Sequence, residues 1–146
     1  MQIRALVGSG RKVIVIGPEA PLSEAMDLLL THEIGALPVV EDDDRPVGIL
    51  SERDVVRALH KHGAPTPTLS VRRAMRTPPP TCELDTTVLE ATSRMTRERA
   101  RHLIVCGEGR LVAVLSVGDL VKHRLEQMET EASVLRDYVA AQRARM

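Results

Sequence analysis

The sequence predicts an α+β fold made of two tandem units, each with the order strand, helix, strand, strand, helix, and then a C-terminal helix. One motif occurs twice: an apolar run, then Ser-x-x-Asp, then two more apolar residues. Its copies are VGILSERDVV at 47–56 and VAVLSVGDLV at 112–121. A second phrase precedes each copy, GALPVV at 35–40 and RHLIVC at 101–106. A repeat of about sixty-five residues that fills most of a short chain indicates two copies of one unit packed together.

The first unit is expected at residues 11–62, after an N-terminal segment at 1–10. Its strands are short apolar runs between turn residues, and its helices have apolar side chains at spacings of three and four. The elements in order are a strand at 13–16, a helix at 22–32, strands at 37–40 and 47–50, and a helix at 52–61. A Gly- and Pro-rich stretch ends the last helix, so residues 63–70 are expected to form an exposed linker.

The second unit, at residues 71–124, is expected to repeat this order. Its elements are a strand at 81–83, a helix at 88–97, strands at 103–106 and 111–115, and a helix from Val117. A three-stranded sheet with helices on one face leaves its other face uncovered. The two units are therefore expected to pack sheet to sheet.

The C-terminal segment, residues 125–146, is predicted to be an amphipathic helix that continues the last helix of the second unit. Its apolar residues alternate at spacings of four and three, which is a heptad seam: Val121, Leu125, Met128, Ala132, Leu135 and Val139. Such a seam packs on another helix, and the sequence leaves open whether that helix belongs to the same or to a second subunit.

Composition excludes several classes of function. Lys plus Arg and Asp plus Glu both number 20, so no net positive field attracts nucleic acid. Tyr138 is the only aromatic residue, which leaves no stacking platform for single-stranded bases. The two cysteines are too few for a disulfide framework, and neither a secretory signal nor a membrane-length apolar run is present. We expect a cytoplasmic protein with no nucleic-acid or membrane partner.

Ser51-x-x-Asp54 and Ser116-x-x-Asp119 lie where a strand is expected to turn into a helix. On spacing alone, each is most simply a capping box, in which Ser and Asp satisfy the free amides of the first helical turn. The same geometry suits a nucleotide, because a helix N-terminus offers amide donors to a phosphate and a carboxylate can accept bonds from a ribose diol. The residues alone leave both interpretations open.

The phrases GALPVV with VGILSERD, and RHLIV with VAVLSVGD, resemble the two halves of a cystathionine-β-synthase (CBS) domain pair, also called a Bateman module. The resemblance covers about residues 11–125, and the C-terminal continuation is similar to that of small stand-alone bacterial CBS proteins. It implies a regulatory sensor that binds AMP or another adenine nucleotide (ADP, ATP or NAD(H)) and acts through conformation or assembly. The resemblance also implies a homodimer through the faces of the CBS pair, with the C-terminal helix bracing that pairing. The downstream protein is unknown.

The resemblance also implies two nucleotide sites, each drawing on both copies. One would combine Ser51, Arg53 and Asp54 with Thr81, Cys82, Arg101, His102 and Leu103. The other would join Ser116 and Asp119 to Val15, Ile16, Gly35, Ala36 and Pro38. By family analogy the aspartates hold ribose, and the arginines and His102 supply phosphate charge. Because Gly118 replaces Arg53 in the second copy, we expect the Asp54 site to prefer a compact monophosphate and the Asp119 site to bind more weakly or to accept a bulkier ligand.

No nucleophile with a recognisable base partner and no zinc-type ligand cluster occurs in the sequence, so neither catalysis nor a metal is expected. The alternative to a nucleotide sensor is a structural dimerisation module whose Ser-x-x-Asp boxes only cap helices. A glycine-rich stretch at 8–12 precedes a strand instead of following one, and is therefore expected to be an ordinary loop.

Overall fold

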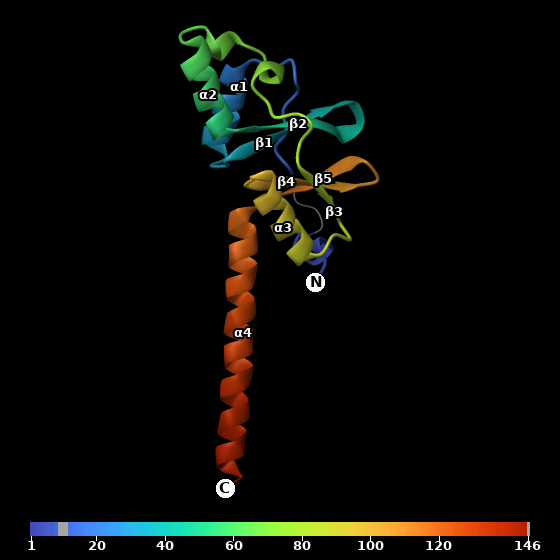
Figure 1. Ribbon diagram of the computed structural model, residues 1–146, viewed down its shortest axis with the longest axis vertical. Helices are drawn as coiled ribbons and strands as arrows, with labels where there is room; N and C mark the ends of the chain where they lie inside the picture. Colours follow the sequence, from blue (N-terminus) through green and yellow to red (C-terminus); the bar gives the residue numbers. More distant parts are fainter. Residues whose placement is uncertain (9–11, 146) are drawn as a thin grey trace.

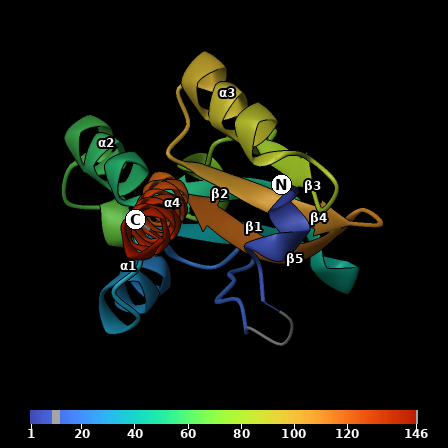
Figure 2. The same ribbon diagram turned by 90° about the horizontal axis from the view of Figure 1, so that it is seen from below.

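The computed structural model describes residues 1–8 and 12–145, and it confirms an α+β fold built from two similar units. The strands of both units lie between helices α1 and α2 on one side and α3 on the other, and α4 runs away from this body (Figure 1). Viewed from below, α4 is seen nearly end-on (Figure 2). The centre of the glycine-rich stretch at 8–12 lies outside the described residues.

The first unit contains two helices around a two-stranded antiparallel sheet. Its elements are α1 (Leu22–Thr31), β1 (Ala36–Glu41), β2 (Arg45–Ser51) and α2 (Glu52–His62), with the short 3-10 turns η2 (Asp42–Asp44) and η3 (Thr66–Thr68). The turn η4 (Val71–Arg73), which was expected in the second unit, packs on the first, because Val71 is fully buried in the first unit's core. The turn between the strands is η2, whose three aspartates are exposed to solvent.

The second unit contains a three-stranded sheet in the order β3, β4, β5. Its elements are β3 (Thr81–Glu83), α3 (Val88–Glu98), β4 (His102–Gly107) and β5 (Arg110–Ser116). β3 pairs with β4 in parallel, and β4 pairs with β5 antiparallel. The N-terminal turn η1 (Ile3–Ala5) joins this unit, because Ile3 is fully buried in its core and the Ile3 amide donates to the Thr86 carbonyl over 2.8 Å.

The strand predicted at 13–16 is reduced to a single bridge between Ile16 and Val39. The Ile16 amide donates to the Pro38 carbonyl (3.2 Å), and the Val40 amide donates to the Ile16 carbonyl (3.0 Å). One step earlier in this parallel ladder the donor would be the amide of residue 38. Proline has no N–H, so the ladder stops after one bridge and the first sheet keeps two strands.

Alternate residues of each strand face opposite sides of the sheet and fill two kinds of core. One face packs on the helices of the same unit, with Leu37, Val39 and Leu50 in the first unit and Leu103, Val105 and Leu115 in the second. The other faces meet between the units, where Ala36, Ile49, Ile104 and Cys106 form a third cluster. The predicted sheet-to-sheet packing is therefore present.

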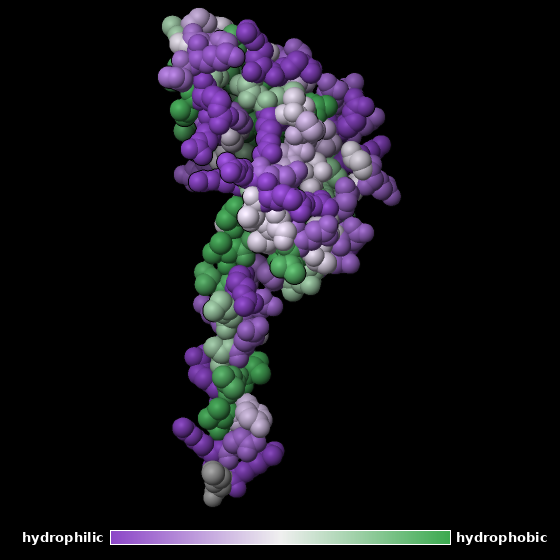
Figure 3. Space-filling view, in the orientation of Figure 1, coloured by the Kyte–Doolittle hydropathy of each residue, from purple (hydrophilic) through white to green (hydrophobic). Residues whose placement is uncertain are grey.

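Helix α4 (Val117–Ala144) is continuous for 28 residues, so the last helix of the second unit and the C-terminal helix are one element. Leu120 is its only buried residue in the described part. Hydrophobic side chains lie along the projecting part of the helix, exposed to solvent (Figure 3). No helix among the described residues is long and apolar enough to cross a membrane.

Candidate functional site

Two cavities lie between the units, one beside each Ser-x-x-Asp box. The cavity beside Asp54, here called the Asp54 cavity, measures about 660 Å³. The cavity beside Asp119, here called the Asp119 cavity, measures about 550 Å³. Each is lined by residues from both units, which is the arrangement that a ligand shared between two repeats needs.

The Asp54 box forms a complete cap on α2. The Asp54 amide donates to Ser51 Oγ (3.2 Å), and the Ser51 amide donates to Asp54 Oδ2 (2.9 Å). The Ser51 hydroxyl also donates to Oδ2 (2.9 Å). The second carboxylate oxygen, Oδ1, accepts from Arg57 Nη1 over 3.0 Å. The Asp54 side chain is 12% exposed and Arg57 is 69% exposed, so the carboxylate is fixed while the guanidinium that covers it reaches into solvent.

The Asp54 cavity is strongly cationic. Five arginines line it, against the two acidic residues Glu52 and Asp54: Arg53, Arg57, Arg76, Arg99 and Arg101. Arg99 is held at the end of α3 in a left-handed conformation with φ 52°. Side chains of one charge around a concave surface raise the local concentration of ligands of the opposite charge. The charge set therefore fits a phosphorylated ligand.

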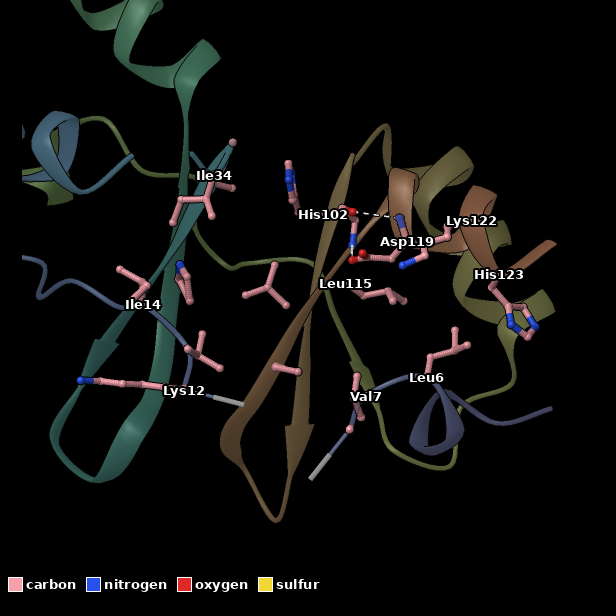
Figure 4. A pocket seen from close by; sticks show the side chains of 18 of the residues that line it. Leu6, Val7, Lys12, Ile14, Ile34, His102, Leu115, Asp119, Lys122 and His123 are labelled. Atoms are coloured by element: carbon pink, nitrogen blue, oxygen red, sulfur yellow. Dashed lines mark hydrogen bonds between the residues drawn. The ribbon is translucent and has the colours of Figure 1, made fainter. Parts of the chain in front are cut away.

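The Asp119 cavity has the same cap but a different lining. The Asp119 amide donates to Ser116 Oγ (3.0 Å), and the Ser116 amide donates to Asp119 Oδ2 (2.8 Å). Lys12 and Lys122 face this cavity together with three carboxylates, those of Glu33, Asp119 and Glu126. Apolar side chains complete the lining, with Leu6, Val7 and Leu115 on the second unit's side and Ile14 and Ile34 opposite them (Figure 4).

His102 stands between the two cavities and lines both, together with Gly35 and Ala36. A Cβ added at Gly35 would lie 3.5 Å from His102 Cε1, so the glycine brings the backbone of the first unit close to the imidazole. Burial lowers the pKa of His102; Asp119 and Glu52 raise it by their charge, and Arg101 lowers it. A charge change in either cavity therefore acts on the same imidazole.

The structure places most of the predicted site residues at the two cavities. Ser51, Arg53, Asp54, Arg101 and His102 line the Asp54 cavity, and Gly35, Ala36, Pro38, Ser116 and Asp119 line the Asp119 cavity. Five others do not line either one: Val15, Ile16, Thr81, Cys82 and Leu103. Ile16, Cys82 and Leu103 are buried in the cores of their own units. Their proposed contact with a ligand stays a prediction.

Arg57 and Lys122 are a symmetric pair of cavity residues that the sequence prediction did not include. Each follows the aspartate of its box by three residues, and residues three apart lie on the same face of a helix. Comparison of SERDVVR with SVGDLVK contains this signal. Lys12 and Arg76 also line the cavities, but they come from loops that no repeat spacing marks. Arg99 does have a repeat equivalent, Glu33, which lines the other cavity and has nearly the same positive φ (52° and 51°).

In the part of the chain that the structure describes, no three His, Cys, Asp or Glu side chains lie close enough together to hold a metal ion. Burial raises the pKa of the Cys82 thiol to about 11 and also raises that of Cys106. Both thiols are buried and free. That no metal binds remains a prediction.

The repeated unit matches a known family. The CBS domain family matches the chain twice, at residues 6–61 and at residues 71–126. The chain belongs to the CBS domain family. The paired cavities thus lie between two CBS domains.

Solved CBS structures share this fold. A CBS-domain containing protein from Agrobacterium tumefaciens is 36% identical, with a TM-score of 0.78 over 84% of this chain and 92% of that one. Hypoxic response protein 1 of Mycobacterium tuberculosis is 29% identical over 76% of this chain and 78% of its own length. A structure of Hypoxic Response Protein I with two coordinated zinc ions has a TM-score of 0.73, 26% identity, and coverage of 84% and 98%. CBSX2 in complex with AMP shares the fold at 23% identity, with a TM-score of 0.74 and coverage of 87% and 98%.

Proposed function

We propose that this chain is a regulatory module that binds an adenine nucleotide between its two CBS domains and responds by a change of conformation or assembly. The observation that carries this proposal is the Asp54 cavity. It combines a fixed carboxylate at a helix N-terminus with five arginines in a space of about 660 Å³. A ribose diol and a phosphate need these two features side by side.

The Asp54 carboxylate is the proposed ribose acceptor. Its Oδ2 caps α2, so the ribose hydroxyls donate to Oδ1 in place of Arg57. The displaced guanidinium is long, exposed and free to turn toward the phosphate. The capping and nucleotide interpretations are thus compatible, because the cap uses one oxygen and the ligand uses the other.

The phosphate group lies against Arg53 and Arg101 in this proposal. Among the described residues, neither guanidinium has a side-chain hydrogen bond or ion pair with the protein, so both are available to a ligand. A charge-assisted hydrogen bond contributes roughly 1.5 to 3 kcal/mol. The structure of the relative CBSX2 with AMP makes AMP the first nucleotide to test.

The Asp119 cavity is proposed as a weaker site or one for a bulkier ligand. Gly118 stands where the first copy has Arg53, and the cations of this cavity are Lys12 and, about one turn further along α4, Lys122. Three carboxylates still outnumber these two lysines around the cavity. A ligand with less phosphate charge relative to its apolar surface suits this lining.

A structural dimerisation module without a ligand is the second candidate. The observation that favours it is that both Ser-x-x-Asp boxes form complete helix caps. Capping alone accounts for the presence of Ser and Asp at these positions. It does not account for the arginines that surround Asp54.

Thermal unfolding in the presence of AMP, ADP, ATP, NAD, NADH and S-adenosylmethionine separates the candidates. A ligand at about a hundred times its dissociation constant stabilises the folded state by roughly 2.7 kcal/mol. For a chain of this size that raises Tm by several degrees. No shift with any ligand would favour the structural module, and product formation in the same mixtures would indicate an enzyme.

The proposed assembly is a homodimer that uses the faces of the CBS pair and α4, and that presents its state to a downstream protein. The support is the heptad seam of α4, whose apolar residues are exposed in the single chain. Burial of such side chains on association is favourable at roughly 25 cal/mol per Å².

A further inference from the structure

We propose that α4 forms a parallel, in-register, two-stranded coiled coil with α4 of a second copy of this chain. The proposal deepens the homodimer of the proposed function by naming the element, the direction and the alignment of the two helices. It depends on three features of α4: an exposed apolar seam, the side of the helix on which this seam lies, and the charges that flank it.

The seam residues are large, apolar and exposed. Val121 is 52% exposed, Leu125 56%, Met128 50% and Leu135 62%. With Ala132 and Val139 they occupy the a and d positions of successive heptads, taking Leu125 as a and Met128 as d. Contiguous exposed apolar residues of this kind mark an interaction surface. Figure 3 shows such side chains on the projecting part of α4.

The seam faces away from the body of the molecule. Successive residues of an α-helix are about 100° apart, so positions b, c and f lie on the side opposite a and d. Leu120, at c, is the residue of α4 that packs in the core of the second unit. Asp119 and Glu126, at b, line the Asp119 cavity. A second helix can therefore approach the seam from its first turn without displacing the CBS domains.

The flanking charges select the parallel, in-register alignment. In that geometry each g residue lies beside the e residue five positions further along the partner helix. Arg124 then meets the partner's Glu129, and Glu131 meets the partner's Arg136. By the two-fold symmetry each pair occurs twice, which gives four attractive contacts. Tyr138 lies beside the partner's Arg143, which suits the stacking of a guanidinium on an aromatic ring.

The antiparallel alternative brings like charges together. Only one antiparallel alignment pairs all six seam residues, with Val121 opposite the partner's Val139. In this alignment Glu129 faces the partner's Glu129, and Glu131 faces the partner's Glu131. Lys122 similarly faces the partner's Arg136. Like charges at such positions destabilise a helix pair, so the sequence disfavours this arrangement.

Disulfide cross-linking of Gln142→Cys in the full chain tests the direction of the helices. Gln142 occupies d near the end of α4, where a parallel pair brings the two substituted residues together. In the antiparallel alignment the two would lie roughly 36 Å apart along the helix axis. We expect mild oxidation to convert most of this variant into a covalent dimer. Ala144→Cys, at the outer position f, is the matched control and cross-links much less.

A charge exchange between positions 131 and 136 tests the alignment. Glu131→Arg places a second guanidinium beside the partner's Arg136, and we expect the dimer dissociation constant in analytical ultracentrifugation to rise about tenfold. Adding Arg136→Glu restores it to within about threefold of the original. Residues five apart do not contact within one helix, so this recovery reports contact between chains. Asp137→Arg, the same charge change at position f, is the control and leaves the constant nearly unchanged.

Two results would overturn the coiled coil: no preferential cross-linking of Gln142→Cys over Ala144→Cys, or additive effects of Glu131→Arg and Arg136→Glu with no recovery. A failure here remains distinct from a failure of the proposed function. A chain that still shows a nucleotide-dependent rise in Tm retains its ligand site and lacks only the helix pair.

Discussion

At the scale of single residues, the position of His102 between the two cavities links them chemically. Its equivalent in the first copy is Ala36, which also lines both cavities. The second residue of each repeated segment, GALPVV and RHLIVC, therefore lies between the two cavities. Because one of these equivalent residues is alanine and the other histidine, the region between the cavities is chemically asymmetric. Of these two residues, His102 of the second copy is the one that can take up a proton.

The first prediction concerns the pH dependence of stability. Burial holds the pKa of His102 in the folded chain below its ordinary value of 6.5, so the unfolded chain takes up a proton first as the pH falls. The free energy of unfolding should therefore decrease as the pH falls through 6.5 toward the lower pKa of the folded state. His102→Gln should remove this component. Urea unfolding of both proteins from mildly alkaline to mildly acidic pH measures it; equal slopes for the two would exclude His102 as the cause.

The second prediction concerns the buried thiols. Burial raises the pKa of Cys82 to about 11 and raises that of Cys106 as well, and thiolates are the reactive form. Neither cysteine should react with a thiol reagent such as Ellman's reagent at mildly alkaline pH in the folded protein, and both should react in denaturant. Rapid reaction of either thiol in the native chain would show that its core opens readily.

At the scale of elements, the two copies differ where β2 meets the connection between the units. Ile49 and Arg76 exchange two backbone hydrogen bonds, of 3.0 and 2.8 Å, so the chain after η4 runs beside β2. A Cβ added at Gly48 would lie 2.5 Å from Met75 Sδ and 3.0 Å from the Arg76 carbonyl oxygen. The equivalent residue in the second copy is Ala113. A side chain at position 48 would therefore have to displace Met75 and press on the Arg76 carbonyl, in a close approach that the described residues show only in the first copy.

The third prediction follows from that difference. Gly48→Ala should lower the free energy of unfolding by about 1 to 3 kcal/mol, because Met75 and the Arg76 backbone must shift. Gly118→Ala, in the first turn of α4, meets only Ser116 Oγ at 3.5 Å and should stabilise the chain by about 0.5 to 1 kcal/mol. Chemical denaturation of both variants checks the pair. Equal effects at the two glycines would show that the packing around Gly48 does not matter.

Local sequence signals predicted most elements, and they failed where a tertiary contact decided. The apolar run at 13–16 has the composition of a strand, but Pro38 in the neighbouring strand cannot donate the next ladder bond. The same limit on local signals applies to the residues that line the two cavities. The Ser-x-x-Asp boxes and the residues beside them were recognisable from the repeat, whereas Lys12 and Arg76 reach the cavities only because the folded chain brings their loops there.

At the scale of the whole molecule, α4 connects the ligand cavity to the proposed dimer. Its first turns carry Asp119 and Glu126, which line the Asp119 cavity from the side opposite the heptad seam, and Lys122, which lines the same cavity from a position that flanks the seam. Lys122 occupies an e position whose partner at g is Val117, so the coiled coil does not require its charge. A ligand and a second chain can thus bind opposite sides of one helix.

The fourth prediction is reciprocal coupling between ligand and dimer. If a ligand in the Asp119 cavity favours the paired position of α4, it lowers the dimer dissociation constant, and dimerisation raises ligand affinity by the same factor. Coupling of this kind is typically about 5- to 150-fold, or about 1 to 3 kcal/mol. Sedimentation with and without saturating ligand measures it. Identical dimer dissociation constants with and without ligand would show that ligand binding and dimerisation are not coupled.

The central claim is that the Asp54 cavity binds an adenine nucleotide through its arginines, and calorimetric titration with AMP tests it most directly. The unmodified chain should bind AMP, and Arg101→Gln should bind it at least about tenfold more weakly. Arg110 lies at the opposite end of the β4–β5 pair from Arg101, so Arg110→Gln should bind AMP like the unmodified chain. Absence of binding heat together with an unchanged Tm, or equal affinity of Arg101→Gln and Arg110→Gln, would contradict the claim.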